Sequence, residues 1–117
     1  MKKILIVDDS ADDRDLLLSF LTQNGFLCDD ASSGKEALER IMIKVYDLII
    51  SDFQMPDGDG PWLASQLKQS HFTSKFLLVS SEAVLEGQKL LDENKIDMFL
   101  SKPLDFNLLL SHINLLT

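Results

Sequence analysis

Residues 3–9 read KILIVDD, a short apolar run followed at once by two aspartates, and this stretch decides the fold that we expect. A near-continuous apolar run is typical of a strand in a parallel sheet that is covered on both faces. In open parallel sheets, ligands bind at the carboxyl ends of the strands. Asp8 and Asp9 therefore indicate where a functional site should lie.

Short apolar runs of this kind recur along the chain, at residues 3–7, 26–28, 47–50, 75–79 and 97–100. The segments between them have helical spacing of apolar residues, as in Leu17 with Leu21 and Leu109 with Ile113. Such alternation predicts an α/β fold, a doubly wound five-stranded parallel sheet with right-handed crossovers and helices on both faces.

Several polar residues mark the helix boundaries. Ser10 with Asp13 and Ser33 with Glu36 have the spacing of a reciprocal cap, in which two side chains satisfy free amide groups at a helix start. Gly25 stands where the first helix should end.

The chain has 117 residues, of which 45% are hydrophobic, and this size predicts one domain over residues 1–117. Cys28 is the single cysteine, so the fold needs no disulfide and a cytoplasmic location is expected. Apolar runs such as 4–7 are far shorter than the ~20 residues that cross a bilayer. The chain either works alone or belongs to a longer protein with an output domain.

The charge of the chain limits its partners. The formal net charge is −8, with acidic clusters in residues 8–15 and 52–59. A negative surface repels a phosphate backbone and an anionic membrane alike, so we expect neither direct nucleic-acid binding nor membrane binding.

The residues that follow the predicted strands have complementary chemistry. Asp8 and Asp9 follow the first strand, Asp52 ends the third, Ser80 ends the fourth and Lys102 follows the fifth. Crowded carboxylates repel one another unless a cation compensates. Mg²⁺ prefers such oxygen ligands and leaves room for a phosphoryl group. We expect Asp9 and Asp52 to hold Mg²⁺, with Asp8 acting through water, while Lys102 and Ser80 bind phosphoryl oxygens.

Asp52 is the expected phosphoryl acceptor, because a carboxylate can form an aspartyl phosphate. It opens the turn DFQMPDG of residues 52–58, whose proline and glycine can shape a loop around a metal ion.

This pattern resembles the receiver domain of two-component response regulators, and closely resembles the chemotaxis-type single-domain receivers. The resemblance covers essentially the whole chain and rests on Asp8-Asp9, Asp52, Met55-Pro56, Asp57-Gly58, Ser80 and Lys102-Pro103. It implies the strand order 2-1-3-4-5 of the flavodoxin-like fold. It also implies that Asp52 takes a phosphoryl group from a histidine kinase's phosphohistidine or from a small donor such as acetyl phosphate. The backbone carbonyl of Gln54 would be a further Mg²⁺ ligand.

The resemblance also implies a switch. In the family, the hydroxyl residue moves toward the phosphate and an aromatic residue turns inward, which remodels the face of the fourth helix, fifth strand and fifth helix for a partner or output domain. Ser80 and Phe99 match these positions, although Phe99 lacks the hydroxyl of the commoner tyrosine. Ser81 stands where Ala or Gly is usual, and Gln54 and Glu82 occupy the two positions that tune dephosphorylation.

Other polar residues have ordinary explanations. Acids in a first helical turn oppose the helix dipole, which accounts for Asp12, Asp13 and Asp15 without a metal. His71 and His112 lie apart from the acidic cluster and are expected to face solvent.

Two leucines of the last predicted helix fall outside its apolar stripe. Leu108 and Leu115 lie roughly opposite Leu109 and Ile113 at 100° per residue. They are either a partner or homodimer surface, or scattered exposed leucines, which are common.

Two other functions fit parts of the pattern. A magnesium-dependent phosphohydrolase with an aspartate nucleophile would need Asp-x-Asp after the first strand, whereas residues 8–10 read DDS and little chain remains for a substrate cap. A receiver-like module that never takes phosphate would usually lack Asp52, Lys102 or an acid of the Asp8-Asp9 pair, and none of these is missing. We therefore expect a signalling module whose only chemistry is its own phosphorylation and dephosphorylation.

Overall fold

The computed structural model describes residues 1–81 and 84–117, and within these ranges five strands alternate with five helices. The strands are β1 (Lys3–Val7), β2 (Leu27–Ala31), β3 (Leu48–Asp52), β4 (Lys75–Ser80) and β5 (Met98–Ser101). The helices are α1 (Ala11–Gln23), α2 (Gly34–Ile41), α3 (Gly60–Gln69), α4 (Val84–Asp92) and α5 (Phe106–Leu116). None of the helices described is both long enough and apolar enough to span a bilayer.

The strands form one parallel sheet in the order β2-β1-β3-β4-β5. This order confirms the predicted doubly wound topology. The three central strands are almost wholly apolar, and residues such as Ile4, Ile49 and Leu77 have no solvent exposure. Burial on both faces explains why these strands could be recognised as continuous apolar runs.

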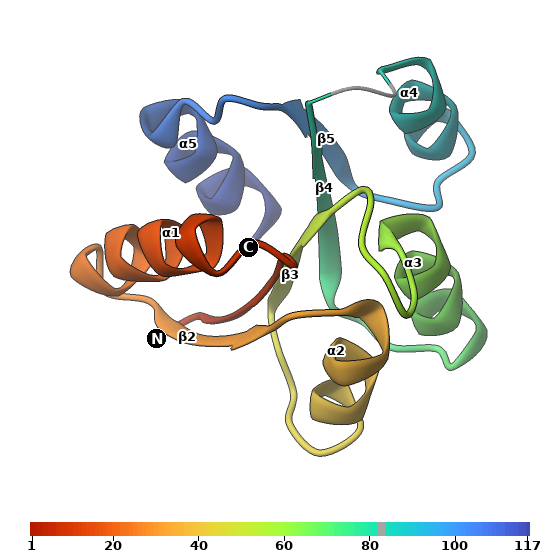
Figure 1. Cartoon of the computed structure of the whole chain (residues 1–117), viewed down its shortest axis with the longest axis horizontal. Helices are drawn as coiled ribbons and strands as arrows, with labels where there is room; N and C mark the ends of the chain where they lie inside the picture. The colour runs from red at the N-terminus through yellow and green to blue at the C-terminus, as the bar shows by residue number, and fades with distance from the viewer. Residues whose placement is uncertain (82–83) are drawn as a thin grey trace.

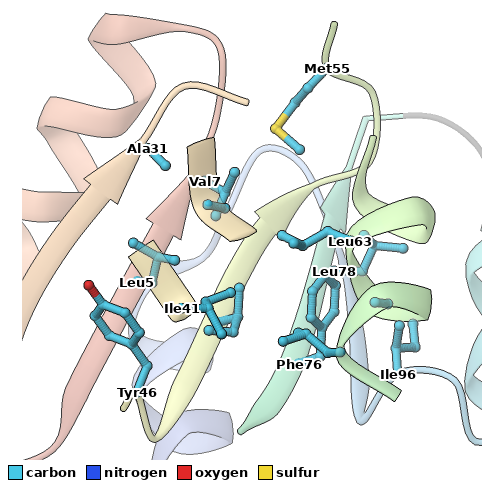
Figure 2. Close-up of a cluster of buried hydrophobic side chains, with 14 residues drawn as sticks. Leu5, Val7, Ala31, Ile41, Tyr46, Met55, Leu63, Phe76, Leu78 and Ile96 are labelled. Carbon is cyan, nitrogen blue, oxygen red and sulfur yellow. The ribbon is translucent and has the colours of Figure 1, made fainter. Parts of the chain in front are cut away.

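Two helical layers cover the sheet (Figure 1): α1 and α5 lie on one face, and α2, α3 and α4 lie on the other. Successive residues of β1 point to opposite faces, so Ile4 packs with the α1 and α5 side and Leu5 with the α2 and α3 side. Figure 2 shows the buried cluster on the side of α2 and α3, in which Leu63 of α3 lies beside Leu78 of β4. Because all five strands are parallel, their carboxyl ends lie together at one edge of the sheet.

The second strand is longer than its apolar run predicts. The expected strand at residues 26–28 is wrong in its bounds, because β2 runs from Leu27 to Ala31 and includes two acids. Within residues 1–81 and 84–117, β2 is an edge strand that pairs only with β1, and both acids have partners outside the sheet. Asp29 accepts a hydrogen bond from Tyr46 Oη at 2.6 Å, and Asp30 from Arg14 Nε at 3.2 Å.

The helix caps form in part as predicted. Ser10 Oγ accepts the Asp13 amide at 3.3 Å, and Ser33 Oγ accepts the Glu36 amide at 3.1 Å. The return bonds differ from the expected reciprocal pair. The Ser10 amide donates to Asp8 Oδ1 at 2.9 Å, and the Glu36 carboxylate accepts from the Ser32 hydroxyl.

Candidate functional site

The carboxyl edge of the sheet gathers the side chains that the strand ends carry. Asp8 follows β1, Asp52 ends β3, Ser80 ends β4 and Lys102 follows β5. Because β1, β3, β4 and β5 are successive neighbours in the sheet, these ends lie side by side although the residues are far apart in sequence. The structure thus brings the ends of these strands together in one rim, as the sequence predicts.

Three carboxylates of this rim form one cluster. Asp8, Asp9 and Asp52 each offer an oxygen, and these oxygens lie within 4.8 Å of one another. Asp8 is only 8% exposed, whereas Asp9 lies at the surface. Hard carboxylate oxygens at this spacing suit Mg²⁺, which typically takes one or two protein carboxylates and keeps several waters. The donor set therefore fits the cation that the sequence predicts.

Lys102 is the cation that the protein itself supplies to the cluster. Its Nζ lies 3.3 Å from Asp8 Oδ2, 3.4 Å from Asp13 Oδ2 and 3.5 Å from Asp52 Oδ1. Burial works against the charged ammonium, but the carboxylates of Asp52, Asp8 and Asp13 outweigh it and raise the pKa of Lys102. The ammonium therefore stays charged where a phosphoryl oxygen would arrive.

Asp13 is a residue of this network that sequence reasoning missed. The helix-dipole explanation is incomplete for Asp13, because its side chain also reaches Lys102. The local sequence holds no signal for this contact, since it depends on where α1 lies against the loop after β5.

Asp52 is a largely buried carboxylate that lies beside another acid, since its side chain is 16% exposed. Burial, together with the charge of Asp8, raises the pKa of Asp52, although Lys102 and the amide of Phe53 oppose the shift. That amide donates to Asp52 Oδ1 at 3.0 Å. A raised pKa means a more basic and more nucleophilic carboxylate.

The loop after Asp52 is anchored to the start of α2. Gly58 O accepts the Gly34 amide at 2.9 Å, and Asp57 O accepts the Lys35 amide at 2.9 Å. Asp57 and Gly58 both have positive φ, 54° and 96°, and the Trp62 ring lies so close to Gly58 that a side chain there would meet it. Such a loop fixes the backbone path through Gln54, whose side chain is exposed.

The predicted switch and tuning residues lie around this rim in different environments. Ser80 is buried at the end of β4, and Ser81 beside it is exposed. Phe99 is partly buried and lies against Gly87 of α4. Glu82 lies outside the described residues.

A pocket of about 430 Å³ opens beside the carboxylates. Asp8, Asp52 and Lys102 line one part of it, and Leu16 and Phe106 line the apolar remainder between α1 and α5. Asp52 is therefore accessible from this pocket.

The remaining predicted residues are placed as follows. Leu108 is 48% exposed and Leu115 is 81% exposed, while Leu109 and Ile113 are fully buried. His71 is exposed as expected. The expectation for His112 is wrong in part, because this residue is partly buried and its inaccessible Nδ1 has no hydrogen-bond partner among the residues that the structure describes.

Known proteins share both the sequence pattern and the fold. Residues 4–114 match the response regulator receiver domain family. The sensor histidine kinase RcsC of Salmonella typhimurium is 33% identical over 106 residues, which are 91% of this chain and 11% of that protein. The transcriptional regulatory protein YxdJ of Bacillus subtilis is 30% identical over 113 residues, which are 97% of this chain and 49% of that protein.

A solved structure agrees along the whole chain. The response regulator TrrA from Thermotoga maritima, in complex with Mg²⁺ and BeF, has a TM-score of 0.89 at 30% identity, with 100% of both chains covered.

The chain belongs to the response regulator receiver domain family. It is a phosphoacceptor signalling module of the two-component type, homologous to domains of both regulators and histidine kinases. The chain spans half or less of the length of the two relatives RcsC and YxdJ.

Proposed function

We propose that Asp52 accepts a phosphoryl group from the phosphohistidine of a sensor histidine kinase, or from a small donor such as acetyl phosphate. One observation carries this assignment: the Asp52 carboxylate ends β3 within 3.5 Å of the Lys102 ammonium and within the same cluster as Asp8 and Asp9. The raised pKa of Asp52 and its place on the pocket wall support this choice.

The chain's own residues supply the groups that the transfer needs. An Asp52 oxygen attacks phosphorus while the bond from phosphorus to the histidine nitrogen breaks, and the imidazole leaves with that electron pair. Lys102 is released from part of its carboxylate pairing and binds one phosphoryl oxygen. Ser80 donates a hydrogen bond to another.

Asp8, Asp9, Asp52 and the backbone carbonyl of Gln54 would hold Mg²⁺, directly or through water. The ion supplies charge neutralisation at the phosphoryl oxygens during transfer. The spacing of the carboxylate oxygens, all within 4.8 Å, supports this ligand set. Gln54 and Glu82 would tune the lifetime of the phosphoryl group.

The output of phosphorylation would be a changed surface. Movement of Ser80 and Phe99 would remodel the face formed by α4, β5 and α5, which controls a partner or an output domain. The exposure of Leu108 and Leu115 on α5 supports a partner or homodimer contact there. Changing both leucines to lysine should abolish partner binding or dimerisation, as measured by light scattering and pull-down. Unchanged mass and binding would leave them as scattered exposed leucines.

Phosphorylation can be tested directly by intact-mass measurement. We expect a single phosphoryl adduct after incubation with acetyl phosphate and Mg²⁺. The adduct should be absent from Asp52→Asn and should not form when the metal is chelated. Turnover of phosphate esters without an adduct would favour the phosphohydrolase, and neither adduct nor turnover would favour a module that never takes phosphate.

A further inference from the structure

Arg14 of α1 reaches back over the end of β1, and none of the roles above uses it. Its Nη1 donates to the backbone carbonyl of Asp8 at 2.8 Å, and its Nε donates to Asp30 Oδ2 at 3.2 Å. The side chain is only 18% exposed. Arg14 therefore connects the end of β1 to β2 through two different nitrogen atoms.

The carbonyl of Asp8 belongs to the peptide group that joins Asp8 to Asp9. On the other side of the residue, the Asp8 amide donates to Ala31 O at 3.1 Å. Both backbone polar groups of Asp8 are thus held, one by Arg14 and one by β2. The orientation of the peptide that leads into Asp9 follows from these two bonds.

The two carboxylates depend on this peptide to different degrees. The Asp8 carboxylate has partners of its own, the Ser10 amide at 2.9 Å and Lys102 at 3.3 Å. Within residues 1–81 and 84–117, no hydrogen bond or ion pair restrains the Asp9 side chain. The backbone on either side of Asp9 therefore places its exposed carboxylate in the cluster with Asp52, and Arg14 holds this backbone at the Asp8 carbonyl.

We propose that Arg14 is a positioning residue for the divalent-cation site, acting through the Asp8–Asp9 peptide. The proposal rests on the Mg²⁺ site of the proposed function. Arginine is suited to this role because its planar guanidinium presents several donors in a fixed geometry and reaches two acceptors at once. A lysine has one nitrogen on a flexible stem and cannot donate from two separate nitrogen atoms held in a fixed geometry.

The test compares Arg14→Lys with Arg40→Lys, which is the same chemical change at a surface ion pair. Arg40 contacts Glu36 at 3.5 Å and is 44% exposed, so this pair should contribute little. Mg²⁺ binding to the wild type and to both variants is measured by titration calorimetry, at a temperature well below their thermal unfolding midpoints. We expect the Kd for Mg²⁺ to rise about tenfold in Arg14→Lys, as for other residues that orient metal ligands, and to stay unchanged in Arg40→Lys.

A second readout separates positioning from general weakening of the fold. The rate of phosphorylation by acetyl phosphate should fall in Arg14→Lys at limiting Mg²⁺ and return to the wild-type rate at saturating Mg²⁺. A lower unfolding midpoint with an unchanged Kd would overturn the proposal, because that is the result of a purely structural role.

Asp30→Asn provides an independent variant, since it weakens the Nε contact and leaves the Asp8 carbonyl bond possible. We expect a smaller loss of Mg²⁺ affinity in the same direction. If Arg14→Lys does not fold, unchanged affinity in Asp30→Asn overturns the proposal. A wild-type chain that takes up no Mg²⁺ contradicts the proposed function itself, and with it this inference.

Discussion

The ring of Phe99 on β5 lies against the backbone of Gly87 on α4, so closely that a Cβ added to Gly87 would stand 2.3 Å from the ring. The absence of a side chain at Gly87 is therefore what lets the ring occupy this position. If Phe99 acts as the proposed switch, this contact would couple a change in β5 to the position of α4.

The variant Gly87→Ala should destabilise the protein, against the usual trend for helices. In an exposed helix interior, alanine is better than glycine by about 1 kcal/mol. Here the ring must move out of its site, and overpacking of this kind costs about 1–3 kcal/mol. We expect a net loss of about 1 kcal/mol in the free energy of unfolding, measured by urea denaturation.

The control is the same substitution in a Phe99→Ala background. Without the ring, Gly87→Ala should be neutral or stabilising, because only the helix preference remains. A loss of equal size in both backgrounds would show that the contact with Phe99 is not the cause.

The variant Lys102→Met should destabilise the apo protein at neutral pH. Lys102 lies within 3.5 Å of carboxylates of Asp8, Asp13 and Asp52, which repel one another when the ammonium is removed. The expected cost is about 1–2 kcal/mol, less than for a fully buried pair because the site is partly open to solvent. Thermal unfolding with a chelator measures it.

Added Mg²⁺ should reduce the difference in stability between the wild type and Lys102→Met, because a bound cation offsets the repulsion among the same carboxylates. Lys95→Met is the matched control, since the one ion pair of Lys95 in the described part of the chain is with Glu93, at 3.7 Å on the surface. It should change the midpoint little with or without Mg²⁺. Equal effects of the two substitutions would contradict the role given to Lys102.

The residues that could be predicted from the sequence are those that follow strands. Asp8, Asp9, Asp52 and Lys102 were predicted to meet because a parallel sheet places all strand ends on one edge. Their identity as acids and a base then indicates the chemistry. The strand order was predicted from the family resemblance, because the alternation of strands and helices alone is compatible with several strand orders.

The residues that could not be predicted act from helices. Asp13 and Arg14 reach the site from α1, and the periodicity of α1 does not reveal where a long side chain ends. The second half of β2 could not be predicted for a related reason, because its two acids interrupt the apolar run. Their partners Tyr46 and Arg14 come from other segments and are seen only in three dimensions.

The variant Gly34→Ala should damage the site through the loop after Asp52. A Cβ at Gly34 would lie 2.3 Å from the carbonyl oxygen of Gly58, which is backbone and cannot swing away like a side chain. The hydrogen bond from Gly34 to Gly58 should break, and the loop that carries Gln54 should shift. We expect lower stability and a several-fold weaker affinity for Mg²⁺, measured by calorimetry.

Gly25→Ala separates these two effects. Gly25 has open space around the Cβ position but a φ of 90°, so alanine there should cost about 1–2 kcal/mol by backbone strain alone. Its affinity for Mg²⁺ should equal that of the wild type. If both glycine variants bind Mg²⁺ as the wild type does, the loop does not position the site.

The variant Tyr46→Phe should lower stability in a way that depends on pH. The Tyr46 hydroxyl, at the edge of the cluster in Figure 2, donates to Asp29 Oδ2 at 2.6 Å. This bond is the main cause that lowers the pKa of Asp29, with Lys44 adding to it.

A carboxyl whose folded-state pKa is lowered stabilises the fold above its unfolded pKa, about 3.9, and this contribution is lost as the pH falls through the folded pKa. Tyr46→Phe should therefore cost about 1.5 kcal/mol at pH 7, and the difference from wild type should shrink in acid. Urea denaturation across this pH range measures the difference, with Asp29→Asn as the control in which the pH dependence disappears. A cost that stays constant down to the most acidic pH would mean that the hydroxyl acts by packing and not through the charged carboxylate.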